Sequence, residues 1–137
     1  PPGVRVLPVE TTLDMAEAVA ASLPDADALV MAAAPADFRP ATVADRKIKR
    51  TGAALAVELA PNPDILASTR DRRRAGAVVV GFALETNDGL AHARAKLAAK
   101  SLDLIVLNDA TEAGAGFGVD TNRVTLVTAA GDEALPL

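Results

Sequence analysis

The 137-residue sequence contains no cysteine, no tryptophan and no tyrosine, and its only aromatic residues are three phenylalanines. Without cysteine, neither a disulfide bond nor a thiolate metal site can form. Proteins that bind single-stranded nucleic acid stack the bases on aromatic rings, and nucleic-acid surfaces are normally basic, whereas this chain has a net charge of −4. These features argue against a nucleic-acid partner.

Long apolar runs and catalytic triads are also missing. No stretch approaches the roughly 20 apolar residues of a membrane-spanning helix, and the N-terminal residues lack the pattern of a signal peptide. The single histidine, His92, has no nucleophile beside it in the sequence, so no Ser-His-Asp or Cys-His site is recognisable. We therefore expect a soluble, cytoplasmic protein without a membrane partner, whose chemistry depends on positioning and charge neutralisation.

Half of the residues are apolar, which suits a close-packed core, and the length predicts one domain, residues 1–137. Three short, continuous apolar runs are typical of strands that are covered on both faces. They occupy residues 27–34, 77–83 and 102–109. Further strands are expected at residues 55–59, where apolar and other side chains alternate, and at residues 123–127, which precede a turn.

Amphipathic segments between these runs predict three helices, at residues 11–24, 62–76 and 86–103. The second helix should begin with Asn62 as its N-cap and Pro63 at its first position. Arginines at positions 70 and 72–74 would then fall in its last turn, where positive charge is favourable, and we interpret them as structural.

Strands that alternate with helices predict an α/β fold: a three-layer, Rossmann-like, mostly parallel sheet with helices on both faces, followed by a C-terminal hairpin. Ligands bind such sheets outside the carboxyl ends of the strands. The residues that end the three apolar runs are therefore candidates for lining one crevice. They are residues 36–38, 82–86 and 108–109.

Four of the five residues 46–50 are basic, although the chain as a whole is acidic. They lie within residues 39–54, where no helix or strand pattern is convincing. A loop of this length is unusual in a compact domain and is more often a functional flap. The cluster is either a solvated loop or an anion clamp in which Lys47 closes over a phosphorylated substrate.

His92, Lys96 and Lys100 recur every fourth residue, on one face of the third predicted helix. Like charges at this spacing repel each other slightly. A solvent-exposed stripe is the simpler interpretation, and a row of donors that reaches a bound anion is the alternative.

Two further segments invite a phosphate-binding interpretation. NPDIL, residues 62–66, is an ordinary helix start, yet the free N–H groups of a helix N-terminus also suit phosphate, and Asp64 could accept hydrogen bonds from a sugar or base. GAGFG, residues 114–118, precedes a predicted strand instead of a helix. We therefore reject it as a dinucleotide loop, which argues against a Rossmann oxidoreductase.

Several segments together resemble bacterial phosphopantothenoylcysteine synthetase, in the family's order and over nearly the whole chain: AAAPADFRP with KIKR, NPDIL, VVGFALET, KLAAKSLDLIVLND and GFGVDTNRVTLV. That family is the C-terminal half of the bifunctional coenzyme A biosynthesis protein. The resemblance implies that 4'-phosphopantothenate is joined to L-cysteine with CTP, through an acyl-cytidylate, releasing pyrophosphate and CMP. It also implies Mg²⁺ with the CTP, a homodimer, and FMN in the decarboxylase half only.

The resemblance places the nucleotide-binding positions of the family on eleven residues of this sequence. They are Ala33, Ala34, Asp37, Lys47, Pro63, Asp64, Ile65, Leu66, Phe82, Lys96 and Lys100. Within this set it implies a catalytic role for Lys47, which would meet phosphate in the transition state. Lys96 and Lys100 would neutralise the triphosphate, and Phe82 would place the base. It implies no particular metal ligands.

The family's synthetase begins with a Gly-rich strand-to-helix turn, followed by a segment whose asparagine and arginine serve the second half-reaction. Neither feature occurs in this sequence, which starts downstream of them. We therefore expect the chain to be part of a longer ligase. The alternative from another class is a non-catalytic nucleotide-binding and dimerisation fragment of that enzyme.

Overall fold

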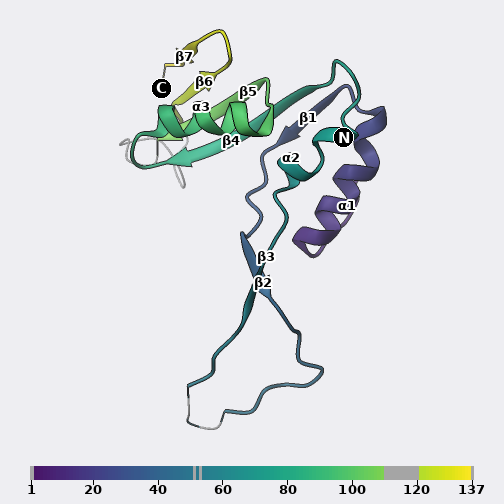
Figure 1. Ribbon diagram of the computed structural model, residues 1–137. Coiled ribbons are helices and arrows are strands. Elements are labelled where there is room, and N and C mark those ends of the chain that lie inside the picture. Colours follow the sequence, from purple (N-terminus) through teal and green to yellow (C-terminus); the bar gives the residue numbers. More distant parts are fainter. Residues whose placement is uncertain (1, 51, 53, 110–120, 137) are drawn as a thin grey trace.

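A computed structural model describes residues 2–50, 52, 54–109 and 121–136 of the chain. Its main sheet has the strand order β1-β4-β5-β6-β7 (Figure 1). The strands are β1 (Ala28–Met31), β4 (Val78–Glu85), β5 (Leu104–Asp109), β6 (Val124–Val127) and β7 (Asp132–Ala134). The first three run parallel, and β6 and β7 form an antiparallel hairpin at the C-terminal side. The predicted α/β fold with a parallel centre and a C-terminal hairpin is confirmed.

The helices are α1 (Thr12–Ser22), α2 (Ile65–Ser68) and α3 (Gly89–Lys100), with 3₁₀ turns at Leu23–Asp25 and Arg70–Arg72. A capping box starts α1: the Thr11 hydroxyl accepts from the Asp14 N–H at 3.1 Å, and the Asp14 carboxylate accepts from the Thr11 N–H at 2.9 Å. No helix in the described part of the chain is long and apolar enough to cross a membrane.

The prediction of a helix over residues 62–76 with Asn62 as its N-cap is wrong. The N-cap is Asp64, whose Oδ1 accepts from the Ala67 N–H at 3.1 Å, and the α-helix ends at Ser68. The Asn62 side chain has other partners, because its Nδ2 donates to the carbonyl of Ala36 at 2.8 Å. Pro63 consequently precedes the cap instead of opening the helix.

One face of the sheet forms the core. Val79, Ile105 and Val127 are almost fully buried there, and Ala93 of α3 packs into the same cluster. Gly81 lies between them because the packing leaves no room for a side chain: a Cβ atom would approach Leu102 Cδ1 to 2.9 Å. This close approach brings the segments around α2 and α3 onto β4, where the candidate site is built.

The opposite face of β1 and β4 is exposed in the described structure. Side chains of Val30, Val78, Phe82 and Leu84 alternate with the buried ones and retain between 43% and 61% of their accessible surface. The prediction that these apolar runs are covered on both faces is therefore wrong for the described residues. A strand's composition indicates that it is suited to burial, but it does not say whether the covering surface belongs to the same chain.

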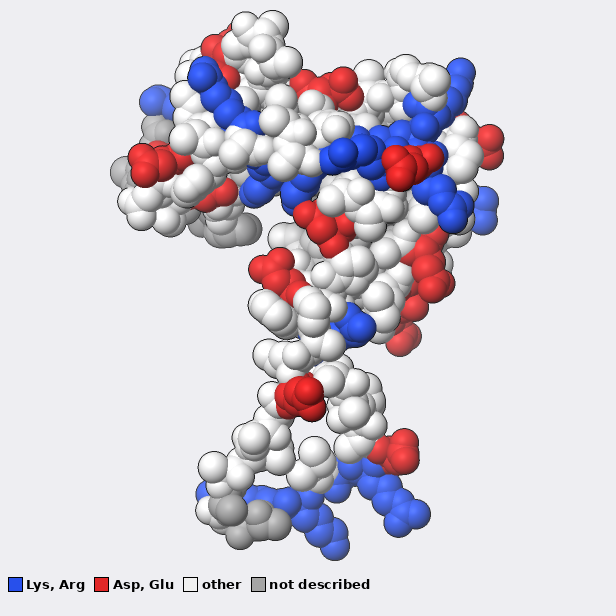
Figure 2. Space-filling model, viewed as in Figure 1, with Lys and Arg blue, Asp and Glu red and all other residues white. Residues whose placement is uncertain are grey.

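A long arm leaves the body beside α2 (Figure 1). Its base is the antiparallel pair β2 (Phe38–Pro40) and β3 (Leu59–Pro61). The prediction of a strand over residues 55–59 is wrong except at Leu59, because Leu55 and Val57 are largely exposed and pair with no strand among the described residues. Lysine and arginine side chains gather at the far end of the arm (Figure 2). The action of residues 39–54 as a flap stays a prediction.

Candidate functional site

A pocket of about 270 Å³ lies beside the carboxyl end of β1. Its walls come from the loop after β1, the segment that enters α2, the middle of β4 and one side of α3. Ten of the eleven predicted nucleotide-binding residues line it: Ala33, Ala34, Asp37, Pro63, Asp64, Ile65, Leu66, Phe82, Lys96 and Lys100. The fold therefore gathers into one cavity residues that are up to 67 positions apart in the sequence, counted from Ala33 to Lys100.

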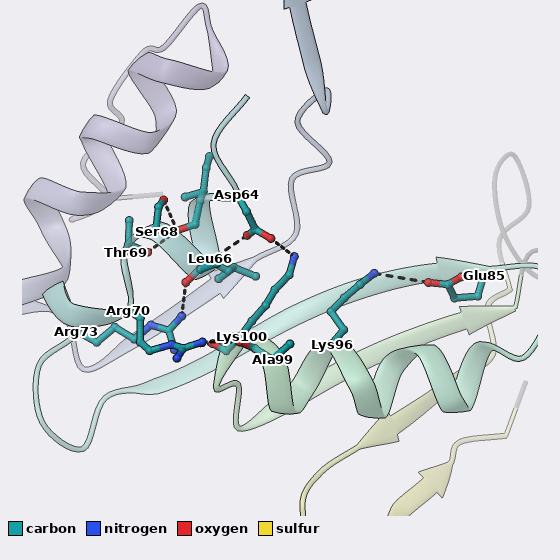
Figure 3. Close-up of polar contacts among 12 residues, drawn as sticks. Asp64, Leu66, Ser68, Thr69, Arg70, Arg73, Glu85, Lys96, Ala99 and Lys100 are labelled. Carbon is teal, nitrogen blue, oxygen red and sulfur yellow. Dashed lines mark hydrogen bonds and ion pairs between the residues drawn. The ribbon is translucent and has the colours of Figure 1, made fainter. Parts of the chain in front are cut away.

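Lys100 and Asp64 form an ion pair across this pocket, with the Lys100 Nζ 2.7 Å from the Asp64 Oδ2 (Figure 3). Asp64 also caps α2, so one carboxylate joins the start of α2 to the end of α3. Burial acts to raise the pKa of Asp64, but hydrogen bonds from Lys100 and from the Ala67 N–H outweigh it, and the pKa lies below its ordinary value. The carboxylate is therefore ionised at neutral pH and available as an acceptor.

Lys96 and His92 both meet Glu85, the last residue of β4. The Lys96 Nζ lies 3.5 Å from Glu85 Oε1 (Figure 3). The His92 Nδ1 lies 3.4 Å from Glu85 Oε2. Exposure falls along the stripe, from 60% of the His92 side chain to 34% for Lys96 and 25% for Lys100. The two lysines thus point into the protein, whereas His92 is a surface residue, as the simpler interpretation of the stripe would have it.

The remaining predicted residues contribute in different ways. Ile65 and Leu66 are buried members of the core cluster, whereas Asp37 is exposed at the rim. The ring of Phe82 is 43% exposed and, by the alternation of a strand, projects from the face opposite Gly81.

Asn62 lines the pocket, although the sequence predicts it to be a helix cap. Its backbone N–H donates to the carbonyl of Asp37 at 2.8 Å, and its side-chain oxygen accepts from Arg39 at 3.2 Å. With its bond to Ala36, it ties together the loop after β1, the arm and the entrance to α2. The available signal in the sequence was a polar residue directly before Pro-Asp. It could not identify the partners of Asn62, because they lie more than 20 residues away in the sequence.

Lys47 does not line this pocket. Lys47 is exposed on the arm, in the segment between β2 and β3. The pocket beside β1 is formed without Lys47. The structure therefore separates the predicted catalytic lysine from the other ten predicted residues.

The expectation of a single crevice is wrong, because a second cavity of about 460 Å³ contains Glu85, Thr86, Asn108 and Asp109. The strand register explains the division. β1 ends at Met31, which is paired with Gly81, whereas β4 and β5 continue together to Glu85 and Asp109. The segment GAGFG lies outside the described residues.

The sequence predicts that the arginines before β4 act at the end of their own helix, but among them only Arg73 reaches a carbonyl of α2 in the described structure, that of Leu66, and the other bonds of Arg70 and Arg73 go to another helix. Arg70 donates to the carbonyl of Ala99, and Arg73 donates to the carbonyls of Lys100 and Ser101, all at the C-terminal end of α3 (Figure 3). Positive charge is favourable at the C-terminal end of α3 for the same electrostatic reason that predicted it at the end of α2.

The described residues contain no group of three or more His, Cys, Asp or Glu side chains that could hold a metal ion. Mg²⁺ that accompanies a nucleotide needs only one or two carboxylates, with phosphates and waters as its other ligands. Asp37 and Asp64 line the pocket and fit that more modest requirement.

Comparison with known proteins identifies the family. A family model described as the DNA/pantothenate metabolism flavoprotein C-terminal domain matches residues 1–137. The coenzyme A biosynthesis bifunctional protein CoaBC of Vibrio vulnificus (strain CMCP6) is 40% identical over 139 residues, which cover 100% of this chain and 35% of that protein. A protein named cysteine/cysteine sulfinic acid decarboxylase, from an unknown prokaryotic organism, is 41% identical over 124 residues, which cover 90% of this chain and 34% of that protein. The chain thus spans about a third of the length of these relatives.

Solved structures agree with this result. The crystal structure of the C-terminal domain of CoaBC superposes with a TM-score of 0.76 and 31% identity, covering 100% of this chain and 59% of that one. A Cab2 mutant in complex with phosphopantothenate-cysteine has a TM-score of 0.75 at 20% identity, covering 96% of this chain and 46% of that one, a likeness of fold. The resemblance noted in the sequence is confirmed, and the chain belongs to the family of the DNA/pantothenate metabolism flavoprotein C-terminal domain.

Proposed function

We propose that this chain is the nucleotide-binding part of a cytoplasmic phosphopantothenate–cysteine ligase in coenzyme A biosynthesis, dependent on CTP and Mg²⁺. The observation that carries the proposal is the pocket beside β1, which is lined by two partly buried lysines, Lys96 and Lys100, and in which Lys100 pairs with Asp64, the N-cap of α2. The 40% identity to CoaBC over the whole chain supports the pathway. A protein of the same fold has been solved with phosphopantothenate-cysteine, which is the product of the proposed reaction.

In the proposed reaction, a carboxylate oxygen of 4'-phosphopantothenate attacks the α-phosphorus of CTP and pyrophosphate leaves. The amine of cysteine then attacks the acyl carbon of the acyl-cytidylate, and CMP leaves as the amide forms. Lys96 and Lys100 lie where they can neutralise phosphate charge, and each now holds a carboxylate that a phosphate would replace or share. Asp64 would accept from the cytidine, and Mg²⁺ bound with the CTP would offset charge on its phosphates.

Lys47 would serve a second copy of the chain. The arm carries it away from its own pocket, and a homodimer in which each arm reaches the other subunit would return it to a nucleotide site. There it would stabilise the charge that builds during nucleotidyl transfer and help to exclude water from the acyl-cytidylate.

The position of Lys47 also favours the alternative, a nucleotide-binding and dimerisation fragment without turnover. Pyrophosphate release separates the two. The full-length protein should release pyrophosphate only when CTP and phosphopantothenate are both present, and CMP when cysteine is added. Binding of CTP without release would support the fragment, and release of CO₂ from cysteine instead would support the activity in the name of the decarboxylase relative.

A further inference from the structure

We infer that Arg73 is a positioning residue: it holds Lys100 in place for the nucleotide by joining the C-terminal end of α3 to α2. The inference rests on the proposed function, because it concerns the same pocket. Arg73 is not among the residues that line that pocket, and nothing in the reaction requires it to touch substrate.

The first half of this link is at α3. One terminal nitrogen of Arg73, Nη1, donates to the carbonyl of Lys100 at 3.1 Å and to that of Ser101 at 2.6 Å. The last carbonyls of a helix have no partner within the helix, so these bonds fix its final turn. Ser101 is a non-glycine residue with a φ of 50°, a strained conformation that persists only where surrounding contacts impose it.

The second half is at α2. The other terminal nitrogen of Arg73, Nη2, donates to the carbonyl of Leu66 at 2.5 Å. The two helices are thus joined by Asp64 and Lys100 on the pocket side and by Arg73 behind it, next to the bond from Arg70 to Ala99 (Figure 3). Lys100 is the last residue of α3, so its backbone is held by Arg73 while its ammonium group faces the pocket.

This arrangement requires an arginine. Its planar group presents two nitrogens in a fixed geometry, so one side chain can bind carbonyls of two elements at once, which a lysine does less well. The Nε atom is buried without a hydrogen-bond partner in the described structure, so the terminal nitrogens make the connection. Losing them would leave Arg70, which donates to the carbonyl of Ala99, as the remaining arginine at this end of α3, and would allow the backbone of Lys100 to shift from the phosphate position.

The test uses the full-length protein and measures binding of CTP and CMP by isothermal titration calorimetry. Arg73→Met removes the donors and keeps the apolar stem, and Arg73→Lys keeps the charge. Arg72→Met is the matched control, since Arg72 is the neighbouring arginine that ends the 3₁₀ turn, is exposed, and makes no side-chain hydrogen bond or ion pair in the described structure. Lys100→Met and the double variant with Arg73→Met complete the cycle.

Arg73→Met should raise the Kd for CTP about tenfold, with a much smaller rise for CMP and unchanged stoichiometry, since a charge-assisted contact to the distal phosphates is lost. Arg73→Lys should fall between it and the wild type, and Arg72→Met should match the wild type. In the Lys100→Met background, Arg73→Met should add little. If Arg73→Met does not fold, Arg73→Lys carries the same comparison.

Three results would overturn the inference. A purely structural role would lower the stoichiometry of binding and leave the Kd unchanged. An effect of Arg73→Met that is equally large without Lys100 would show that it does not act through that lysine. An Arg73→Met variant that binds CTP normally, while Lys100→Met does not, would show that Arg73 is not needed to position the lysine. Failure of the wild type to bind CTP would instead refute the proposed function itself.

Discussion

Replacing Lys100 with methionine should weaken binding of a nucleoside triphosphate much more than binding of the monophosphate. Lys100 is 25% exposed and its Nζ lies 2.7 Å from Asp64, so its ammonium group already points into the pocket. Methionine keeps the apolar stem and removes the charge. The effect should therefore report the lost phosphate contact more than lost packing.

The magnitude follows from two opposing terms. A hydrogen bond between a lysine and a phosphate oxygen contributes about 1.5–3 kcal/mol because one or both partners are charged. To bind the phosphate, Lys100 must give up or share its ion pair with Asp64. Because the Asp64 side chain is 45% exposed, that ion pair contributes only about 0–1 kcal/mol. The net loss on mutation is about 1–2 kcal/mol, or roughly a 5- to 30-fold rise in the Kd for CTP.

Calorimetric titration with CTP, CDP and CMP would measure this difference. Arg94→Met is a suitable control, because it removes one positive charge from the same helix at a position that pairs with Asp132, away from the pocket. Equal losses of CTP and CMP affinity for Lys100→Met would refute the reasoning, since the lysine would then act on the nucleoside or on the fold.

Three further predictions concern the arm and the cap of α2. Lys47→Gln should lower the turnover number for pyrophosphate release far more than it raises the KM for CTP, and a raised KM with unchanged turnover would make Lys47 a ground-state binding residue instead. Asp64→Ala should reduce the free energy of unfolding by about 0.5–2 kcal/mol because the N-cap is lost, while Asp64→Asn, which can still cap, should lose less; equal losses in urea denaturation would contradict the capping role. Because the pKa of Asp64 is lowered in the folded state, its contribution to stability is present above its unfolded pKa and is lost as the pH falls through the folded value, so the stability difference between wild type and Asp64→Asn should shrink below about pH 4. A difference that stays constant down to pH 2 would show that the charge of Asp64 does not stabilise the fold.

Much of the candidate site could be predicted because it follows local rules. Residues 33–37 follow a strand that its apolar sequence predicts, and the carboxyl ends of parallel strands are where α/β sheets bind ligands. Lys96 and Lys100 are one helical turn apart, so their common face could be inferred from spacing alone. The family resemblance then singled out the same segments, and the fold brings them to one cavity.

The parts that could not be predicted depend on contacts between distant segments. Arg73 reaches carbonyls that are 27 and 28 positions later in the chain, and Asn62 bonds to Ala36, 26 positions earlier. Neither partner is encoded in a local period, and a capping preference was the stronger local signal for Asn62. The split into two cavities arises from the unequal lengths of β1 and β4, and element boundaries are the least certain feature of any sequence pattern.

If each arm acts in the partner's site, as proposed above, the activity of the enzyme would depend on the concentration of its subunits. In the proposed dimer, the arm would hold Lys47 near the partner's nucleotide site. Its effective concentration there would be on the order of millimolar for as long as the two subunits stay together. Once dilution separates them, the arm delivers that lysine to empty solvent, because its own chain's pocket lies at the other end of the arm. Catalysis would then be lost when the dimer dissociates. A separated subunit would be inactive without any additional inhibitor.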